Sequence, residues 1–306
     1  MLCSYINTNG TELKPFTPTE WFNLAKKMLH HQLQPADLMN FSKEDYKSKL
    51  DLDASLVQRI LALLDRGANL TFELEKYHQQ GINIITKADR EFPKVLKIKL
   101  ANTCPPLFYY AGDLDILKNK FIGFVGSRNI EKQDQNFAEL TTNKILKQNY
   151  SIVSGGAKGI DTVSENIALN RGIAVTEYMA DSMVGKMRKV EIIKAIQNAQ
   201  LLLLSAVSPN AGFNAGNAMM RNAYIYAQAE AAVVVKADLQ KGGTWNGAIS
   251  NLRHHWCKTL CWKNAKYPGN MELIKRGAIA IDENWDGKIE HLNESPIPQQ
   301  GELFNI

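Results

Sequence analysis

The stretch from residue 121 to residue 161 reads FIGFVGSRNIEKQDQNFAELTTNKILKQNYSIVSGGAKGID. It holds two apolar runs of strand length, Phe121–Val125 and Ser151–Ser154, with a polar segment of helical length between them. A turn that begins with glycine follows each run. Strands that alternate with helices in this way are typical of a parallel sheet covered on both faces, so this stretch predicts the fold.

The same alternation continues toward the C-terminus. Continuous apolar runs such as LLLL and AAVVV fit strands that are buried on both faces. Further runs of this kind occur at residues 173–178, 201–207, 231–235, 259–262 and 278–281. We therefore predict an α/β domain over residues 81–285, with a Rossmann-like parallel sheet and helices on both of its faces.

The residues before this pattern predict a small helical domain, residues 1–80. Thr17 and Glu20 have the spacing of a capping box, and Pro18 stands at the first helical position. We expect this domain to serve packing or oligomerisation. A helix-hairpin-helix DNA module is the alternative, but its glycine hairpin is not visible.

Length and composition restrict the class of protein. The chain has 306 residues, of which 45% are hydrophobic and 22% charged, as in ordinary globular proteins of about two domains. Four scattered cysteines fit a reducing compartment. We see no membrane-length apolar run and no signal peptide, so we expect a cytoplasmic protein. The net charge of +5 is compatible with a polyanionic partner but does not require one.

The turns after the first two parallel strands predict a phosphate site. Parallel sheets bind ligands at the carboxyl ends of their strands, and glycine lets a backbone approach a ligand closely. Arg128 and Lys158 add positive charge there, while Asp161 is better interpreted as a helix cap, because a carboxylate repels phosphate. We expect backbone approach and N–H donors from Gly126, Ser127, Gly155, Gly156 and Gly159. In the alternative, these glycines only permit tight turns.

A dinucleotide site is a second interpretation of the same glycines. Glu177 follows Gly159 at about the distance expected for a ribose-binding acid. However, the pattern is GGxxG rather than GxGxxG, and Glu177 can equally be a residue at a strand end. We expect no cofactor.

Both glycine turns resemble motifs of the DprA/Smf family of DNA-processing proteins. Val125-Gly126-Ser127-Arg128 matches the first motif, and residues 154–161 match the second, which has the pattern S-G-x-A-R-G-I-D-x-x-A-H. The resemblance covers about residues 75–282. It extends to the flanking pairs Phe92-Pro93, Pro105-Pro106, Gly112-Asp113, Gly269-Asn270 and Gly277-Ala278.

The chain also departs from the family pattern. Lys158 replaces an arginine, and Ser164-Glu165 stands where Ala-His is expected. The family's F-P-x-R-N-R motif has become FNAGNA from Phe213 onward, with Arg221 one helical turn further on, where we expect it to reach the same space. The 24 residues after Asp282 are too few for the winged-helix domain that many members carry. We expect a divergent member without that domain.

The resemblance implies a function. The family binds single-stranded DNA, usually as a homodimer, helps to load a RecA-type recombinase during natural transformation, and is not known for catalysis. Arg128, Lys158 and Arg221 are then expected to hold phosphates. Nearby aromatic side chains are either core residues or surfaces on which bases stack; Phe213 and Trp245 are our candidates for stacking, ahead of Tyr224 and Tyr226.

Other functions are less well supported. A nucleotide-binding sensor of the same superfamily, acting for example in phage defence, is the main alternative. Lys241-Gly242-Gly243-Thr244 is similar to the glycine loop of related nucleotide-cleaving enzymes, but no acid follows it, so we expect no enzyme. A zinc site at His254, His255, Cys257 and Cys261 is excluded by the distance between the cysteines across a strand.

The last residues, 286–306, predict a flexible tail. Gln300, Leu303 and Phe304 resemble the Q-x-x-L-F peptide with which bacterial replication and repair proteins bind the sliding clamp. A docking role is one interpretation. In the other, the two apolar residues fold back onto the protein, or the match is due to chance.

Overall fold

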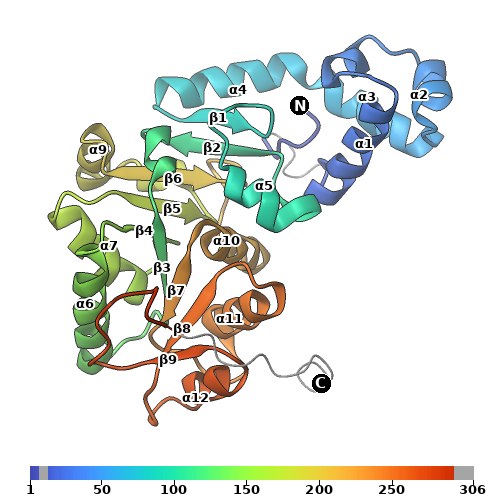
Figure 1. Ribbon diagram of the computed structural model, residues 1–306. Coiled ribbons are helices and arrows are strands. Elements are labelled where there is room, and N and C mark those ends of the chain that lie inside the picture. The colour runs from blue at the N-terminus through green and yellow to red at the C-terminus, as the bar shows by residue number, and fades with distance from the viewer. Residues whose placement is uncertain (7–12, 293–306) are drawn as a thin grey trace.

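A computed structural model describes residues 1–6 and 13–292 (Figure 1). Its centre is a sheet with the strand order β1-β2-β6-β5-β4-β3-β7-β8-β9. The strands are β1 (Asn83–Thr86), β2 (Leu107–Ala111), β3 (Phe121–Val125), β4 (Ser151–Ser154), β5 (Val175–Met179), β6 (Leu201–Ser205), β7 (Ala231–Val234), β8 (Lys258–Trp262) and β9 (Ile279–Ile281).

Strands β3 to β9 run parallel, whereas β1 and β2 form an antiparallel edge. Ile84 pairs with Tyr109, and Tyr109 pairs in turn with Ser205 at the end of β6. The prediction of a Rossmann-like parallel sheet is confirmed for the main part of the sheet. The antiparallel edge is an addition that the long apolar runs did not indicate.

Helices cover both faces of the sheet, as predicted. One face packs against α4 (Gly67–Gln79), α6 (Lys132–Leu146), α7 (Ile160–Asn170) and α9 (Val190–Gln197). The other face packs against α5 (Lys94–Leu100), α10 (Ala215–Gln228), α11 (Gly242–His254) and α12 (Pro268–Lys275). The short helix α8 (Met183–Lys186) and the 3-10 turns η2 (Ala101–Thr103) and η3 (Leu114–Lys118) complete this part.

The alternation of side chains in β3 shows why the run FIGFV forms a central strand. Ile122 and Phe124 join the core on one face, and Phe121 and Val125 join the core on the other. All five residues of the strand are buried. Burial on both faces requires an apolar residue at every position, which is the pattern that predicted the sheet.

The N-terminal helices form a separate small core. They are α1 (Pro18–His30), η1 (Pro35–Met39), α2 (Lys43–Leu50) and α3 (Ala54–Asp65). The predicted capping box is confirmed, since the Thr17 N–H donates to Glu20 Oε2 at 2.8 Å and the Glu20 N–H donates to Thr17 Oγ1 at 3.3 Å. Leu70 and Tyr77 of α4 belong to the core of the sheet instead. The two cores therefore divide between α3 and α4, and a boundary at residue 80 stays a prediction.

The strand order reverses direction at β3, which places a binding crevice. From β3, the chain adds β4, β5 and β6 on one side and then β7, β8 and β9 on the other. The connections that leave β3 and β7 diverge at their carboxyl ends, and ligands of such sheets bind at this point.

Among the described residues, no helix is long and apolar enough to cross a membrane.

Candidate functional site

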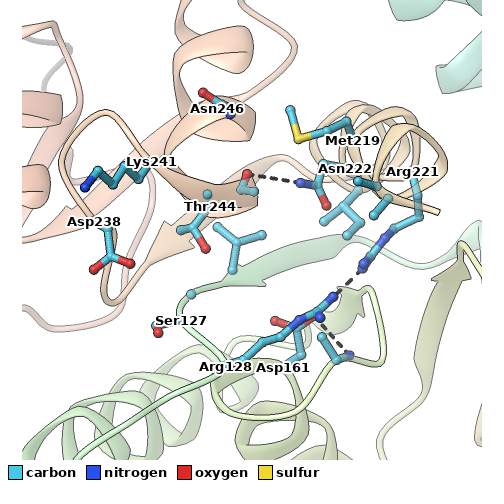
Figure 2. Close-up of a pocket in the computed structure, with 18 of the residues that line it drawn as sticks. Ser127, Arg128, Asp161, Met219, Arg221, Asn222, Asp238, Lys241, Thr244 and Asn246 are labelled. Atoms are coloured by element: carbon cyan, nitrogen blue, oxygen red, sulfur yellow. Dashed lines mark hydrogen bonds and ion pairs between the residues drawn. The ribbon is translucent and has the colours of Figure 1, made fainter. Parts of the chain in front are cut away.

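A hollow of about 590 Å³ lies at the carboxyl ends of β3 and β7 (Figure 2). Its walls come from the turn after β3, from α10, and from the connection that leads from β7 into the start of α11. Gly126, Ser127 and Arg128 lie on the β3 side, while Lys236, Asp238 and Lys241 follow β7. The hollow is thus located where the topology predicts it.

A second hollow of about 450 Å³ adjoins the first. It extends over the glycine turn after β4 toward α8, and Gly155, Gly156 and Lys189 contribute to its lining. Four residues line both hollows: Arg128, Ala157, Phe213 and Arg221. The two hollows together form one crevice across the strand ends, which we call the β3–β7 crevice.

Arg221 is buried at the junction of the two hollows, with only 7% of its surface exposed. Its Nη1 atom lies 3.9 Å from Asp161 Oδ2, and its Nε has no hydrogen-bond partner among the described residues. A Cβ atom on Gly155 would lie 0.9 Å from Nη1, so Gly155 leaves the space that the guanidinium occupies. The expectation that Arg221 reaches this crevice from one turn further along α10 fits its position.

A second guanidinium lies close by. Arg128 is exposed, and its Cζ atom lies 5.4 Å from the centre of the Phe213 ring, which is itself 61% exposed. Burial lowers the pKa of Arg221, Asp161 opposes this effect, and the positive charge of Arg128 lowers the pKa further. The guanidinium groups of Arg128 and Arg221 thus lie near enough to repel each other, and Asp161 at 3.9 Å from Arg221 is a loose ion-pair partner, so the arrangement attracts an anion.

The N–H groups of the glycine turn do not serve as predicted. Gly155 and Ala157 donate to Asp161 Oδ2 at 3.2 and 3.4 Å, and Gly156 donates to Ser154 Oγ and Glu165 Oε1, both at 3.1 Å. The Ser127 N–H donates to the Lys236 carbonyl. This corrects the prediction that Gly155, Gly156 and Ser127 offer N–H donors to a phosphate. The side-chain cations of the crevice remain for that task, and the N–H donors expected from Gly126 and Gly159 stay a prediction.

Asp161 therefore accepts hydrogen bonds from the glycine turn after β4 and, contrary to the prediction, is not the N-cap residue of α7. It lies in the first turn of α7, and Gly159 is the N-cap residue. Burial raises the pKa of Asp161 to about 6, and the Arg221 charge opposes this shift. Burial and the charge of Glu177 likewise raise the pKa of Glu165, which also accepts a hydrogen bond from the Ser154 hydroxyl. The departure from Ala-His to Ser164-Glu165 thus adds an acid to a buried polar cluster beneath the turn.

Glu177 belongs to the same buried cluster. It is almost fully buried and forms an ion pair with Lys186. A Cβ atom on Gly156 would approach Glu177 Oε2 to 2.2 Å, so the carboxylate lies against the turn. This position does not support the dinucleotide interpretation, because the acid is already occupied beneath the glycines.

Three predicted site residues lie outside the crevice lining. Lys158 is exposed and lines neither hollow. Gly159, with a φ of 87°, faces the Ser127 backbone, where a Cβ would meet the carbonyl oxygen at 2.4 Å. Trp245 is only 6% exposed and packs in the core beside Arg276, so its interpretation as a stacking surface was wrong. Aromatic residues in amphipathic helices are more often core residues than platforms.

Other crevice residues were missed as binding residues in the sequence. Lys241, Thr244 and Asn246 lie at the start of α11, and Asp238 lies in the turn before it. The signal was present, because this turn follows β7 at the same end of the sheet. Sequence alone did not show that β7 pairs with β3, which brings this turn to the glycine motifs.

Comparisons with known proteins agree with the fold and the motifs. The family model of DNA recombination-mediator protein A matches residues 83–293. The DNA processing protein DprA of Bacillus subtilis is 25% identical over 275 residues, which are 83% of this chain and 89% of that protein. The DprA of Streptococcus pneumoniae is 31% identical over 144 residues, which are 38% of this chain and 50% of that protein.

Two solved structures share the fold. The X-ray structure of Streptococcus pneumoniae DprA has a TM-score of 0.66 at 21% identity and covers 92% of this chain and 99% of its own. A structure of Helicobacter pylori DprA, described for its single-stranded DNA binding mode, has a TM-score of 0.54 at 21% identity, with coverage of 65% and 90%. With the family model matching more than half of its residues, the chain belongs to the family of DNA recombination-mediator protein A.

Proposed function

We propose that the β3–β7 crevice binds the backbone of single-stranded DNA, with Arg128 and Arg221 holding phosphates. The observation that carries this proposal is the pair of neighbouring guanidinium groups at the strand ends, one of them buried with its Nε unpartnered. A buried donor without a partner costs free energy, which an anion in the crevice would recover. The Helicobacter pylori relative, described for its single-stranded DNA binding, supports the choice of anion.

Phe213 supports a single strand over a duplex. Its exposed ring lies beside Arg128 at the junction of both hollows. An unpaired base presents a free face on which an aromatic ring stacks, and a guanidinium over the same ring strengthens such a platform. Bases in a duplex are already stacked on each other and are not available to Phe213.

The wider role follows from the family. We infer that the protein mediates recombination by helping a RecA-type recombinase onto single-stranded DNA, in DNA uptake or in repair, and that it acts as a homodimer without catalysis. Light scattering at micromolar concentration tests the dimer, and a monomer there contradicts it. Retention of a purified recombinase on the immobilised protein tests the partner, and no retention with or without DNA contradicts it.

The docking role of the tail stays a proposal as well. Gln300, Leu303 and Phe304 lie outside the residues that the structure describes. A pull-down with purified sliding clamp compares the wild type with Leu303→Ala/Phe304→Ala. Selective loss of retention in the variant supports docking, and equal retention of both proteins contradicts it.

The central experiment measures binding of a fluorescent single strand as a function of salt concentration. We expect the single strand to bind more tightly than a duplex, and Arg128→Ala to weaken binding and reduce the slope of log K against log salt by about 0.7. Arg171→Ala is the matched control, because it removes the same charge at the far end of α7. Lys158→Ala tests whether a predicted phosphate-binding residue that lies outside the hollows contributes to binding. Unchanged binding in Arg128→Ala would contradict the site.

Competition with free nucleotides completes this experiment. If a mononucleotide binds tightly and depends on Arg128 while DNA does not bind, the nucleotide-sensor alternative replaces the proposal. If DNA binds and mononucleotides at millimolar concentration do not displace it, the sensor alternative is excluded.

A further inference from the structure

The larger hollow of the β3–β7 crevice has two chemically different sides. Phe213, Ala218 and Met219, from α10 and the turn before it, form an apolar side. Asp238, Thr244 and Asn246, from the connection into α11 and its first turns, form a polar side. Figure 2 shows Met219 on α10, Asp238 on the segment that leads into α11, and Thr244 and Asn246 at the start of that helix. At about 590 Å³, the space is in the range of pockets that hold small organic groups.

The polar groups of this hollow are unused. Among the described residues, no hydrogen bond or ion pair engages the side chains of Asp238, Thr244 or Asn246, and Asn222 uses only its amide nitrogen, on the Gly243 carbonyl at 3.1 Å. The lining also includes Tyr226, which is 1% exposed and has a hydroxyl without a partner. By contrast, the acids beneath the glycine turn all have partners. Asp238 and Asn246 are exposed and Thr244 is half-buried, so water satisfies them in the free protein, whereas the buried Tyr226 hydroxyl has no partner among the described residues and favours a ligand with a hydrogen-bonding edge.

The acid at this end argues against a second phosphate. Asp238 adds an exposed carboxylate to a crevice that also holds Asp161 and Asp181 beside its cations, and its charge would repel a phosphate group. A nucleobase fits both sides of the hollow, because its flat faces are apolar and its edge carries donors and acceptors. A carboxylate accepts hydrogen bonds from the exocyclic amino groups of bases such as cytosine, whereas thymine has no amino group.

We propose that this hollow is a subsite for one unstacked base of the bound strand, and that Asp238 makes it prefer bases with an exocyclic amino group. This inference rests on the proposed DNA-binding function. The base next to the phosphate held by Arg128 and Arg221 enters between Met219 and the first turns of α11. Asp238 is then a specificity residue, while the two arginines supply most of the affinity.

Homopolymers of deoxycytidine and deoxythymidine, each about 15 nucleotides long, test the subsite, because every register of such a strand is equivalent. We expect the wild type to bind the cytidine strand at least about fivefold more tightly. Asp238→Asn keeps the size of the side chain and removes its charge, so the ratio should fall to near one. Asp65→Asn, the same change at an exposed position on α3, should leave the ratio unchanged.

The outcomes separate the two proposals. If both strands bind with equal affinity and Arg128→Ala weakens both, the backbone site stands and the base subsite is overturned. A cytidine preference that persists in Asp238→Asn also overturns the subsite. If neither strand binds, the proposed function itself fails.

Discussion

The contact between Gly155 and Arg221 makes a prediction about one methyl group. Gly155→Ala places a Cβ where Arg221 Nη1 lies, so the buried guanidinium must move. We expect a loss of about 1–3 kcal/mol in the free energy of unfolding. In an Arg221→Ala background the same substitution should cost almost nothing, because the space is empty. Chemical denaturation of the four proteins in this double-mutant cycle measures the coupling, and additive effects would contradict it.

Asp161 makes a prediction about pH. Its pKa is raised from 3.8 to about 6 by burial, so the folded state holds this proton more tightly than the unfolded state. The stabilisation is complete below about pH 4 and is lost as the pH rises through 6, a change of about 3 kcal/mol. Asp161→Asn lacks this proton. The free energy of unfolding of the wild type, minus that of the variant, should therefore fall as the pH rises from 4 to 6.5. A difference that stays constant over this range would contradict the assignment.

Among the elements, α1 offers a test of local sequence signals. Thr17→Ala removes the oxygen that accepts the Glu20 N–H, and should lower the free energy of unfolding by about 1 kcal/mol. Glu20 also forms an ion pair with Arg59 of α3, whose Nη1 atom lies 2.7 Å from Glu20 Oε1. The capping box therefore also links α1 to α3. Ser48→Ala on α2 is the matched control, because it removes a hydroxyl bond inside a helix, where little loss is expected. Equal losses in the thermal unfolding of both variants would contradict the capping role.

The same elements show how far the sequence leads. The capping box of α1 and the buried strands depend on neighbouring residues and on periodicity, so local patterns predicted them. The glycine turn after β4 was found too, but not the partners of its N–H groups. Those partners are Asp161 and Glu165, whose carboxylates reach back onto the turn only when α7 packs over β4. The packing of α7 against β4 decides which N–H donors remain free for a ligand. Local sequence patterns do not reveal this packing.

For the whole molecule, Arg66 joins the helical part to the sheet. It donates to the carbonyls of Met1, Ser4 and Ile6 at 2.9, 3.2 and 2.9 Å, and the Ser4 hydroxyl lies 2.8 Å from that of Tyr109 in β2. Arg66→Ala should cost about 1–3 kcal/mol and expose the first residues to proteases. Limited proteolysis followed by mass spectrometry measures the cleavage, with Arg90→Ala as an exposed control. Equal cleavage rates in both variants would contradict this role.

The strand order has a consequence for synthesis on the ribosome. Strands β1 to β6 leave the exit tunnel before β7. They are consecutive neighbours in the sheet, and among the described strands only β3 has a further neighbour, β7, that is made later. Six of the nine strands in the described part of the chain can therefore assemble while the chain is still growing. The β3–β7 crevice cannot, because one of its walls begins at Ala231 and continues into α11. A nascent chain becomes competent to bind its ligand only after β7 and α11 have left the ribosome and β7 has docked against β3.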